Sequence, residues 1–376
     1  MSTTTLKRGL GALGGVGGLL AAGRAAADWG ALNMPTGVTP VSGDVYSLHM
    51  LILWICVAIG VVVFGAIIYS VIKYRKSKGA QAAQFHENTA VEVVWTIIPF
   101  LILVGMAIPA TKTLVVMEKT GEADLTVKVT GYQWKWRYEY IDDGVSFFSN
   151  LATPRAQIYE ASDRDETYLL EVDKPLVLPA GRKIRFLFTG ADVIHSWWVP
   201  DLGFKKDAIP GFINEMWARI DEPGVYRGQC AELCGKDHGF MPVVVEAKTP
   251  DEFQSWLEQQ KVAMAEQAQA AEREWTRDEL MKRGSEVYRQ SCQACHQANG
   301  EGVPGTFPAI KGGAIATGDL DKHIDTVMSG VSGTAMQAFE NQLDDADLAA
   351  VITYERNAFG NNTGDVVQPA DIKAAR

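Results

Sequence analysis

The chain contains 376 residues, which is enough for about two or three domains of ordinary size. Its composition, 47% hydrophobic and 21% charged, is close to that of an average globular protein and excludes a disordered or fibrous one. The net charge of −10 disfavours nucleic acid as a partner. It favours a basic protein, which an acidic surface attracts by electrostatic steering.

The first 27 residues have the pattern of a secretory signal peptide. Lys7 and Arg8 form a short positive region, residues 10–22 are apolar and rich in Gly, and Ala25 and Ala27 offer an Ala-x-Ala cleavage site. A flexible N-terminal tail is the alternative. A signal peptide over 1–27 predicts that the rest of the chain is exported or inserted into a membrane.

Two long apolar runs follow, and we predict that they form a transmembrane helix hairpin over 44–117. Residues 48–72 contain no Asp, Glu, Lys or Arg, and about 20 apolar residues suffice to cross a bilayer. Residues 91–116 include Pro99 and Pro109, which membrane helices tolerate. Buried core helices are the alternative, and the length of the runs and the lack of central charge disfavour them.

The basic residues that follow the first run set the orientation of the hairpin: Lys73, Arg75, Lys76 and Lys78. Loops with such residues next to a membrane helix lie on the cytoplasmic side. Everything after Met117 is therefore expected on the periplasmic side of a bacterial inner membrane. This orientation agrees with an exported N-terminus.

From about residue 125 the hydrophobic residues recur with the period of two that is typical of strands. One extended segment is expected to carry its aromatic side chains on one face: Trp134, Trp136, Tyr138 and Tyr140. Further strands are expected at 167–172, 183–189, 215–220, 225–229 and 243–247. Short strands at this spacing, separated by turn residues, predict an all-β sandwich of Greek-key type over 118–247.

After about Thr249 the pattern becomes helical. Residues 252–273 are rich in Ala, Gln and Glu and contain no Gly or Pro, which predicts a semi-rigid helical linker over 248–277. From 278 to 376, short helical patterns alternate with Gly-rich loops, and a last clear helix is expected at 344–357. The chain therefore ends in a small all-α domain.

Four of the five cysteines form two pairs, while Cys56 lies in the first apolar run and is expected to be a packing residue. The first pair, Cys230 and Cys234, is followed by His238 and Met241. Two thiolates, an imidazole and a thioether are soft ligands of the kind that copper electron-transfer sites use. A single blue-copper centre needs only one cysteine. The second thiolate therefore requires an explanation, and two thiolates can bridge two copper ions provided that each ion finds its own histidine.

The second histidine has to come from another loop of the sandwich, and His195, in the run His-Ser-Trp, is the candidate. A disulfide is the ordinary state of paired cysteines in an exported protein. The neighbouring His and Met disfavour it. A zinc site is the other alternative, but zinc does not call for a methionine.

The pattern Cys-x-Glu-x-Cys-x3-His-x2-Met, with His-Ser-Trp upstream, resembles the binuclear CuA motif of cytochrome c oxidase subunit II. The resemblance covers about residues 40–247 and implies a cupredoxin-like fold with two copper ions bridged by Cys230 and Cys234. It implies these further copper ligands: His195, His238, Met241 and the backbone carbonyl of Glu232. It also implies that the Glu232 carboxylate reaches a magnesium ion shared with subunit I.

Two more residues take a role from the same resemblance. Trp134, in Gly-Tyr-Gln-Trp-Lys-Trp, would receive electrons from cytochrome c, and packing in an aromatic core is the alternative. Glu92, three residues before Trp95, would lie at the mouth of a proton-uptake path into subunit I. A solvated carboxylate at a helix end is the alternative for Glu92.

The second cysteine pair lies in Cys292-Gln-Ala-Cys295-His296, which is the C-x-x-C-H signature of covalent haem c attachment. The two thiols would attach to the vinyl groups of one haem, and His296 would bind its iron. A thioredoxin-like redox pair is the alternative, but it needs a βαβ setting and this region is helical. The sixth iron ligand, usually a methionine, has three candidates: Met336, Met328 and His323.

Met336 is favoured because its surroundings resemble the Met-Pro-x-Phe loop that precedes the last helix of cytochrome c domains. Gln337 stands where proline is usual, and Met328 is then expected in a helix core. The resemblance covers about residues 278–358. The whole arrangement, a multidomain membrane protein with hairpin, sandwich and haem domain, looks like subunit II of a caa3-type oxidase.

This resemblance implies subunit II of a proton-pumping haem–copper terminal oxidase. Electrons would pass from cytochrome c through the chain's own haem c and CuA to the haem of subunit I, which reduces O2 to water. The implied partners are subunits I and III, cytochrome c or the cytochrome bc1 complex, and membrane lipid. The alternative is an electron-transfer subunit of a nitric or nitrous oxide reductase. A quinol-oxidase subunit lacks the copper ligands, which are intact in this chain.

Overall fold

The computed structural model describes residues 33–376, except for 82, 85, 159–161 and 341. The signal peptide predicted over 1–27 lies outside the described residues. The chain forms two compact units. The first contains the helical hairpin and most of the sandwich. The second contains two sandwich strands, the linker helix and the C-terminal helices.

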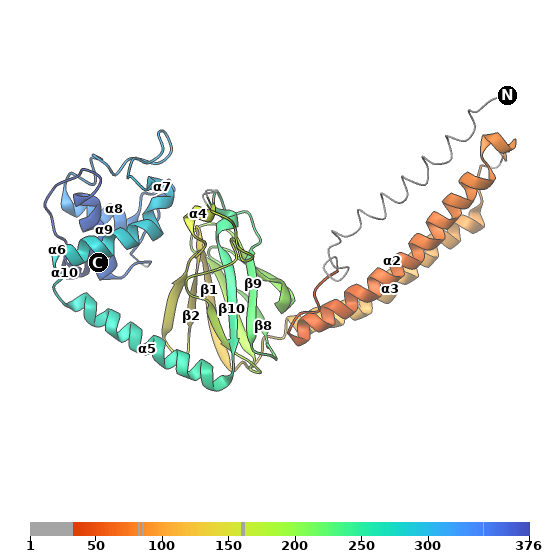
Figure 1. Ribbon diagram of the computed structural model, residues 1–376. Helices are drawn as coiled ribbons and strands as arrows, with labels where there is room; N and C mark the ends of the chain where they lie inside the picture. The colour runs from red at the N-terminus through yellow and green to blue at the C-terminus, as the bar shows by residue number, and fades with distance from the viewer. Residues whose placement is uncertain (1–32, 82, 85, 159–161, 341) are drawn as a thin grey trace, which may run out of the picture. The chain divides into compact units, whose positions relative to one another are not determined.

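Two long helices, α2 (Pro40–Lys73) and α3 (Thr89–Met117), run side by side as a hairpin (Figure 1). Both are long and apolar enough to cross a membrane, and almost none of their side chains is buried. Each helix begins before its apolar run because a polar side chain caps it. Thr39 accepts a hydrogen bond from the Ser42 N–H, and Asn88 accepts one from the Val91 N–H. A pair of helices that is apolar all round is typical of a membrane span.

Hydrogen bonds join the hairpin to the sandwich within the first unit. The Thr39 hydroxyl at the start of α2 donates to the Leu202 carbonyl at 2.9 Å. Near the end of α3, the Trp217 indole donates to the Val116 carbonyl at 3.1 Å. The free ends of both helices are thereby held against the sandwich, while their connecting loop lies at the opposite end of the hairpin.

Within the described residues, ten strands form two five-stranded sheets. The first sheet has the order β3 (Val145–Ser149), β2 (Lys135–Tyr140), β1 (Leu125–Tyr132), β5 (Ile184–Gly190), β8 (Asn214–Ala218). The second has the order β4 (Leu176–Pro179), β10 (Pro242–Lys248), β9 (Gly224–Cys230), β6 (His195–Val199), β7 (Phe204–Ala208). β1 runs parallel to β5 and β4 to β10, and β6 runs antiparallel to both of its neighbours. The prediction of a β-sandwich is confirmed.

Aromatic side chains fill the sandwich beside the strand ends that carry the cysteine motif. Alternate residues of β5 are buried, as its period of two predicts. The Trp197 ring of β6 lies 5.6 Å from Phe186, 5.7 Å from Phe188 and 5.8 Å from Phe204, centroid to centroid. Trp197 is opposite Cys230 in the register of β6 with β9. The buried core therefore fixes the two strands that present the metal-binding residues.

Two sequence expectations about strands were wrong. The aromatic run is not one extended segment, because Gln133 and Trp134 form a turn between β1 and β2. Trp136 and its alternate neighbours in β2 are buried on one face, but Trp134 is not among them. The strand expected at 167–172 is also absent from the described residues. Residues 166–169 form a turn, in which the Asp165 carboxylate accepts hydrogen bonds from the Thr167 N–H and hydroxyl.

The second unit is mostly helical: α5 (Pro250–Glu272), α6 (Arg277–Val287), α7 (Gln293–His296), α8 (Leu320–Ser329), α9 (Asp345–Asn357) and α10 (Pro369–Ala375). The first turns of α5 are anchored, because Trp256 packs 5.3 Å from the Tyr140 ring of β2. Helices α6 and α9 cross closely at Gly284, where a Cβ atom would lie 2.1 Å from the Ala350 carbonyl oxygen. Short α4 (Arg155–Ile158) lies outside both sheets.

Candidate functional site

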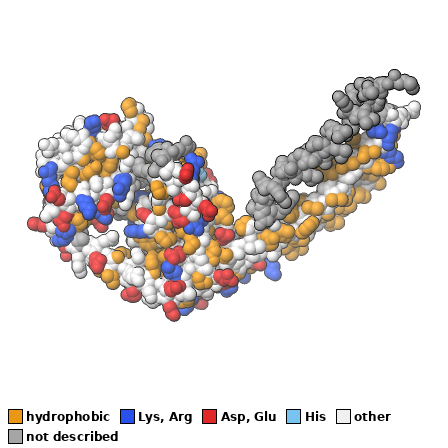
Figure 2. Space-filling view, viewed as in Figure 1, with side chains coloured by type: hydrophobic (Ala, Val, Ile, Leu, Met, Phe, Trp, Pro, Cys, Tyr) orange, Lys and Arg blue, Asp and Glu red, His pale blue; other side chains and the backbone are white. Residues whose placement is uncertain are grey.

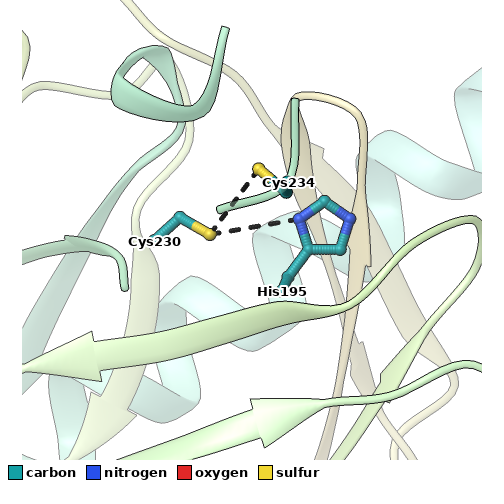
Figure 3. Close-up of side chains that lie close together, drawn as sticks. All are labelled: His195, Cys230 and Cys234. Carbon is teal, nitrogen blue, oxygen red and sulfur yellow. Dashed lines mark hydrogen bonds between the residues drawn. The ribbon is translucent and has the colours of Figure 1, made fainter. Parts of the chain in front are cut away.

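The sheet brings residues from distant parts of the chain to one end of the sandwich. His195 is the first residue of β6, and Cys230 is the last residue of the neighbouring β9. Cys234 and His238 lie in the loop that follows β9, and Met241 immediately precedes β10. In Figure 3 the side chains of His195, Cys230 and Cys234 point toward one another.

The two cysteines face different histidines. The Sγ atoms of Cys230 and Cys234 are 3.8 Å apart, and both cysteines are free and buried. The Sγ of Cys230 is 4.0 Å from Nδ1 of His195, while the Sγ of Cys234 is 3.5 Å from Nδ1 of His238. Each cysteine sulfur therefore has one histidine nitrogen beside it, and the ligand atoms of His195, Cys230 and Cys234 form a compact cluster within 4.8 Å of one another.

Two weaker donors complete the set. Met241 is 1% exposed, and its Sδ lies 3.5 Å from the Sγ of Cys234. The Glu232 carbonyl oxygen lies 3.4 Å from the Sγ of Cys230, while the Glu232 side chain is exposed. All six donors predicted from the sequence are thus brought to one place, with a thioether near one cysteine and a carbonyl near the other.

The donor set fits soft metal ions. Hydrogen bonding from Cys234 lowers the pKa of the Cys230 thiol to about 3, and the same interaction, with burial, raises the pKa of Cys234. Without a metal, the pair therefore holds one proton between two sulfurs. A metal that binds both sulfurs has to displace this proton, and copper and zinc are the ions that bind such thiolates well.

Asp192 fixes the orientation of His195, and we did not identify it from the sequence. The Asp192 Oδ1 is 2.8 Å from Nε2 of His195, and its Oδ2 accepts a hydrogen bond from the Gln133 N–H at 2.7 Å. Burial lowers the pKa of His195, but hydrogen bonds to Asp192 and Cys230 outweigh it and raise the pKa. With the proton on Nε2, the Nδ1 lone pair points at the sulfurs. An Asp three residues before a candidate ligand is the signal that could have revealed it.

Two glycines leave space beside the site that a Cβ atom would fill, and we did not identify either of them from the sequence. A Cβ atom on Gly131 would lie 2.7 Å from Cδ2 of the His195 ring. Gly235 has a φ of +124°, and a Cβ there would lie 2.9 Å from the Gln133 amide nitrogen and 3.1 Å from Cζ2 of Trp134. The half-buried Trp134 therefore lies against the loop that carries Cys234 and His238.

Glu92 lies far from this cluster, in the first turn of α3. Its side chain is exposed, and its Oε1 accepts a hydrogen bond from the Asn88 N–H at 3.3 Å. A carboxylate in the first turn also interacts favourably with the helix dipole. Within the described chain, Glu92 thus has a local role at the start of α3, at the loop end of the hairpin.

The C-x-x-C-H residues lie in the second unit. Cys292 ends a π-helical turn, η6 (Tyr288–Cys292), and Cys295 and His296 belong to α7. Nδ1 of His296 lies 2.9 Å from the Pro308 carbonyl oxygen and donates its proton there. This leaves the lone pair of Nε2 free, which is the arrangement that an iron-binding imidazole requires.

The three candidates for the sixth iron ligand differ in their surroundings. Met336 is half-buried, packs against the same apolar cluster as Cys292, and lies in a loop held by the Phe339 N–H···O Val327 bond of 3.1 Å. Met328 is 4% exposed within the core of α8. The buried His323 has its Nε2 3.0 Å from the Glu355 carboxylate. Met336 is therefore the candidate whose sulfur is not enclosed in the helical core.

Comparisons with known proteins agree with this organisation. The family model described as cytochrome c oxidase subunit II, transmembrane domain, matches residues 27–113, and the periplasmic-domain model of the same subunit matches residues 125–248. The model described as cytochrome c oxidase, cbb3-type, subunit III matches residues 279–354.

Relatives of known name match more than half of this chain. The probable cytochrome c oxidase subunit 2 of Rickettsia bellii is 42% identical over 220 residues, which are 58% of this chain and 80% of that protein. Cytochrome c oxidase subunit 2 of Cereibacter sphaeroides is 38% identical over 269 residues, 65% of this chain and 89% of that protein. The solved periplasmic domain of subunit II of the Bradyrhizobium japonicum oxidase is 43% identical, with a TM-score of 0.35, and covers 38% of this chain and 98% of that one.

The order of the matched segments is the order of the observed parts: two apolar helices, a sandwich with a soft metal site, and a helical domain with C-x-x-C-H. Membrane anchoring, a periplasmic domain, a CuA-type copper site and a cytochrome c domain follow from these matches together with the geometry. This chain belongs to the cytochrome c oxidase subunit II family, the subunit of a haem–copper oxidase that carries the copper domain.

Proposed function

We propose that this chain is the electron-accepting subunit of a proton-pumping terminal oxidase in a bacterial inner membrane. It would receive electrons from cytochrome c and deliver them to the haem of subunit I, where O2 is reduced to water. The observation that carries this proposal is the buried cluster of two neighbouring cysteine sulfurs, each with a histidine nitrogen within 4.0 Å. Such a cluster suits two metal ions that share two sulfurs.

The six donors would hold two copper ions. Cys230 and Cys234 would bridge both ions, His195 would bind one through Nδ1, and His238 would bind the other through Nδ1. Met241 and the Glu232 carbonyl would be the weak ligands. When bound, the copper pair supplies one-electron storage, and the sheet that holds the ligands limits how far they move between oxidation states.

The exposed carboxylate of Glu232 would reach outward to a magnesium ion at the boundary with subunit I. Trp134 would be the point at which electrons from cytochrome c arrive, since its indole lies beside the loop of Cys234. Glu92 would lie at the mouth of a proton-uptake path into subunit I. Its place at the loop end of the hairpin supports this role, because that end lies on the cytoplasmic side of the membrane.

The C-terminal helices would hold one covalent haem c. Cys292 and Cys295 would attach it, and His296 and Met336 would bind its iron, with His296 oriented by the Pro308 carbonyl. We propose the following boundaries: signal peptide 1–27, membrane hairpin 44–117, copper domain 118–247, linker 248–277 and cytochrome c domain 278–376. The proposed partners are subunits I and III, membrane lipid, and cytochrome c or the cytochrome bc1 complex as donor.

An electron-transfer subunit of a nitric or nitrous oxide reductase is the second candidate function, because it could use the same copper and haem sites. Zinc in the thiolate site is a further alternative, since zinc binds the same donor types. Neither alternative explains both the buried Met241 beside Cys234 and the two-helix anchor.

The test is a metal count on the full chain, expressed together with haem c maturation machinery and its oxidase partners. Two coppers and one iron per chain are expected, with oxygen consumption in the presence of reduced cytochrome c. One copper, or zinc in its place, would refute the binuclear site. Reduction of nitric or nitrous oxide in place of oxygen would move the same chain to the second candidate function.

A matched pair of variants locates the copper in the proposed residues. His195→Ala should abolish the binuclear site and leave the covalent haem in place. His49→Ala removes a histidine of α2 whose ring bonds Asn33, away from the cysteines, and should leave both metal contents unchanged.

A further inference from the structure

A cluster of positive charge lies where the first membrane helix ends. The basic cluster comprises Lys73, Arg75, Lys76 and Lys78, all with exposed side chains. In Figure 2 the Lys and Arg atoms gather at this end of the hairpin, next to the apolar surface of the helices. Since the sandwich lies on the periplasmic side, the basic cluster lies at the opposite, cytoplasmic surface of the bilayer.

Part of the basic cluster lies in a hydrogen-bonded backbone turn. Residues Lys76–Lys78 form a 3-10 turn, η3, in which the Lys78 N–H donates to the Arg75 carbonyl at 2.9 Å. Gly79 ends the turn in the left-handed region, at a φ of +72°. Arg75 is the extended N-cap residue of η3 and Lys78 is its last residue, so the backbone hydrogen bond between them places these two cations at the two ends of one turn.

Lys73 is held at the apolar boundary by aromatic rings. Its Nζ donates to the Tyr69 hydroxyl and lies 5.0 Å from the Tyr69 ring and 5.5 Å from the Tyr74 ring. Tyrosines prefer the membrane–water interface, and lysines near helix ends extend toward it. This contact places the basic cluster at the depth of the lipid headgroups and not out in the cytoplasm.

The positive charge of the basic cluster is not balanced by the surrounding sequence. Residues 45–86 contain no Asp or Glu. The first acids beyond it are Glu87 and Glu92, and Glu92 bonds the Asn88 N–H at the start of α3. Four cations at a bilayer surface without local carboxylates attract anions, and the anions that lie at this depth are phosphate-bearing headgroups.

We propose that the basic cluster is a binding site for an anionic phospholipid headgroup, with Arg75 and Lys78 as the pair that contacts the phosphate. The guanidinium of Arg75 offers the planar donors that phosphate oxygens match, and Lys78 adds a second charge beside it. This site lies apart from the copper and haem residues and goes beyond their electron transfer.

The experiment measures lipid selectivity on the full chain, purified in detergent with the subunits that accompany it. Spin-labelled phosphatidylglycerol and phosphatidylcholine are added in turn, and the motionally restricted fraction of each label gives their relative association constant. Phosphatidylglycerol should be favoured at low ionic strength, and the preference should decline in high salt. The double variant R75Q/K78Q should reduce the preference roughly fivefold for each charge removed.

The matched control is K112Q/K119Q, which removes two charges at the other end of α3 and should keep the preference. If R75Q/K78Q retains the wild-type preference, or if the control loses as much, the proposal is wrong. If R75Q/K78Q does not assemble, the single variants R75Q and K78Q give the same decision, since each should reduce the preference more than K76Q does. Inorganic phosphate that abolishes the preference at millimolar concentration would show a free-anion site and overturn the lipid assignment. Copper and iron contents, measured on the same samples, report separately on the proposed electron-transfer function.

Discussion

The copper site and the haem site obtain their geometry from different kinds of structure. In the sandwich, His195 and Cys230 lie on neighbouring strands whose register is fixed by paired residues, and the remaining donors follow within one short loop. In the C-terminal domain, His296 is oriented by a single hydrogen bond to Pro308, and Met336 lies in a separate loop after α8. The copper donors are therefore interdependent, whereas the haem proposed for the C-terminal domain would be held by two covalent bonds that do not need the sixth ligand. The two sites should respond differently to the loss of one ligand.

The largest effect is expected for Cys234→Ser. Cys234 lies beside Cys230, His238 and Met241, so its removal takes away the sulfur that three other donors surround. A serine hydroxyl is a hard donor and does not replace a bridging thiolate. The copper content per chain should decrease by at least half, and the visible and near-infrared absorption of the copper site should be lost. The measurement is metal analysis together with visible and near-infrared spectra.

Haem is the internal control for Cys234→Ser, because its attachment depends on Cys292 and Cys295 in the other unit. Haem content per chain should be unchanged. Equal loss of copper and haem would mean that the two sites fold as one, which would contradict the comparison.

The next effect is expected for Met336→Ala. Loss of a thioether ligand should convert the haem iron from low spin to high spin and lower its reduction potential, because methionine ligation raises the potential. The haem should remain covalently bound through Cys292 and Cys295, and copper should be retained. Spectra and a redox titration of the haem measure this change.

Met328→Leu is the matched control, since Met328 is buried in α8 and leucine has a similar volume. It should keep a low-spin haem. If Met328→Leu, and not Met336→Ala, converts the spin state, the ligand has been assigned to the wrong methionine.

Residue type and spacing determine which features of the two sites and of the membrane helices could be predicted from the sequence. Cysteine, histidine and methionine at short spacing reveal a donor set because ligand chemistry restricts the residue types, and C-x-x-C-H does so for haem. The apolar runs reveal α2 and α3 because bilayer thickness sets their length. The turn at Gln133 and Trp134 could not be predicted in this way, because an aromatic run with a period of two continues through it.

Residues that support the copper ligands only in the folded structure were also not identified from the sequence. Gly131 lies in β1 and His195 begins β6, so their closeness exists only once the two sheets pack together in the folded sandwich. Asp192 is close to His195 in sequence, but its bond to the Gln133 N–H joins two loops that only the fold brings together. Such supporting residues carry no motif, since many residue types could surround a ligand.

Gly131→Ala sharpens the comparison without removing any ligand. The new Cβ would lie 2.7 Å from the His195 ring, so the ring or the strand has to move. Overpacking of this kind costs about 1–3 kcal/mol, and the copper affinity should decrease by roughly tenfold or more. Competition with a copper chelator measures the affinity.

Gly239→Ala is the matched control, because Gly239 follows His238 directly and a Cβ there meets nothing within 4 Å. A loss of copper in Gly239→Ala equal to that in Gly131→Ala would show that the loop, and not the approach to His195, is sensitive.

The smallest effect is expected for Asp192→Ala, which leaves all six donors and the packing around His195 in place. The variant removes the acceptor of the His195 Nε2 proton, so the imidazole can adopt the tautomer that turns Nδ1–H toward the sulfurs. Loss of such a supporting hydrogen bond typically lowers metal affinity about tenfold or more, and the chelator competition used for Gly131→Ala should resolve it. Asp221→Ala is the control, since Asp221 forms an exposed ion pair with Arg219 at 2.7 Å and such pairs contribute little. The redox potential of the haem should be the same in both variants. If Asp192→Ala binds copper as tightly as Asp221→Ala, the hydrogen bond from His195 to Asp192 is not needed. The register of the strands alone would then orient His195 in the copper site.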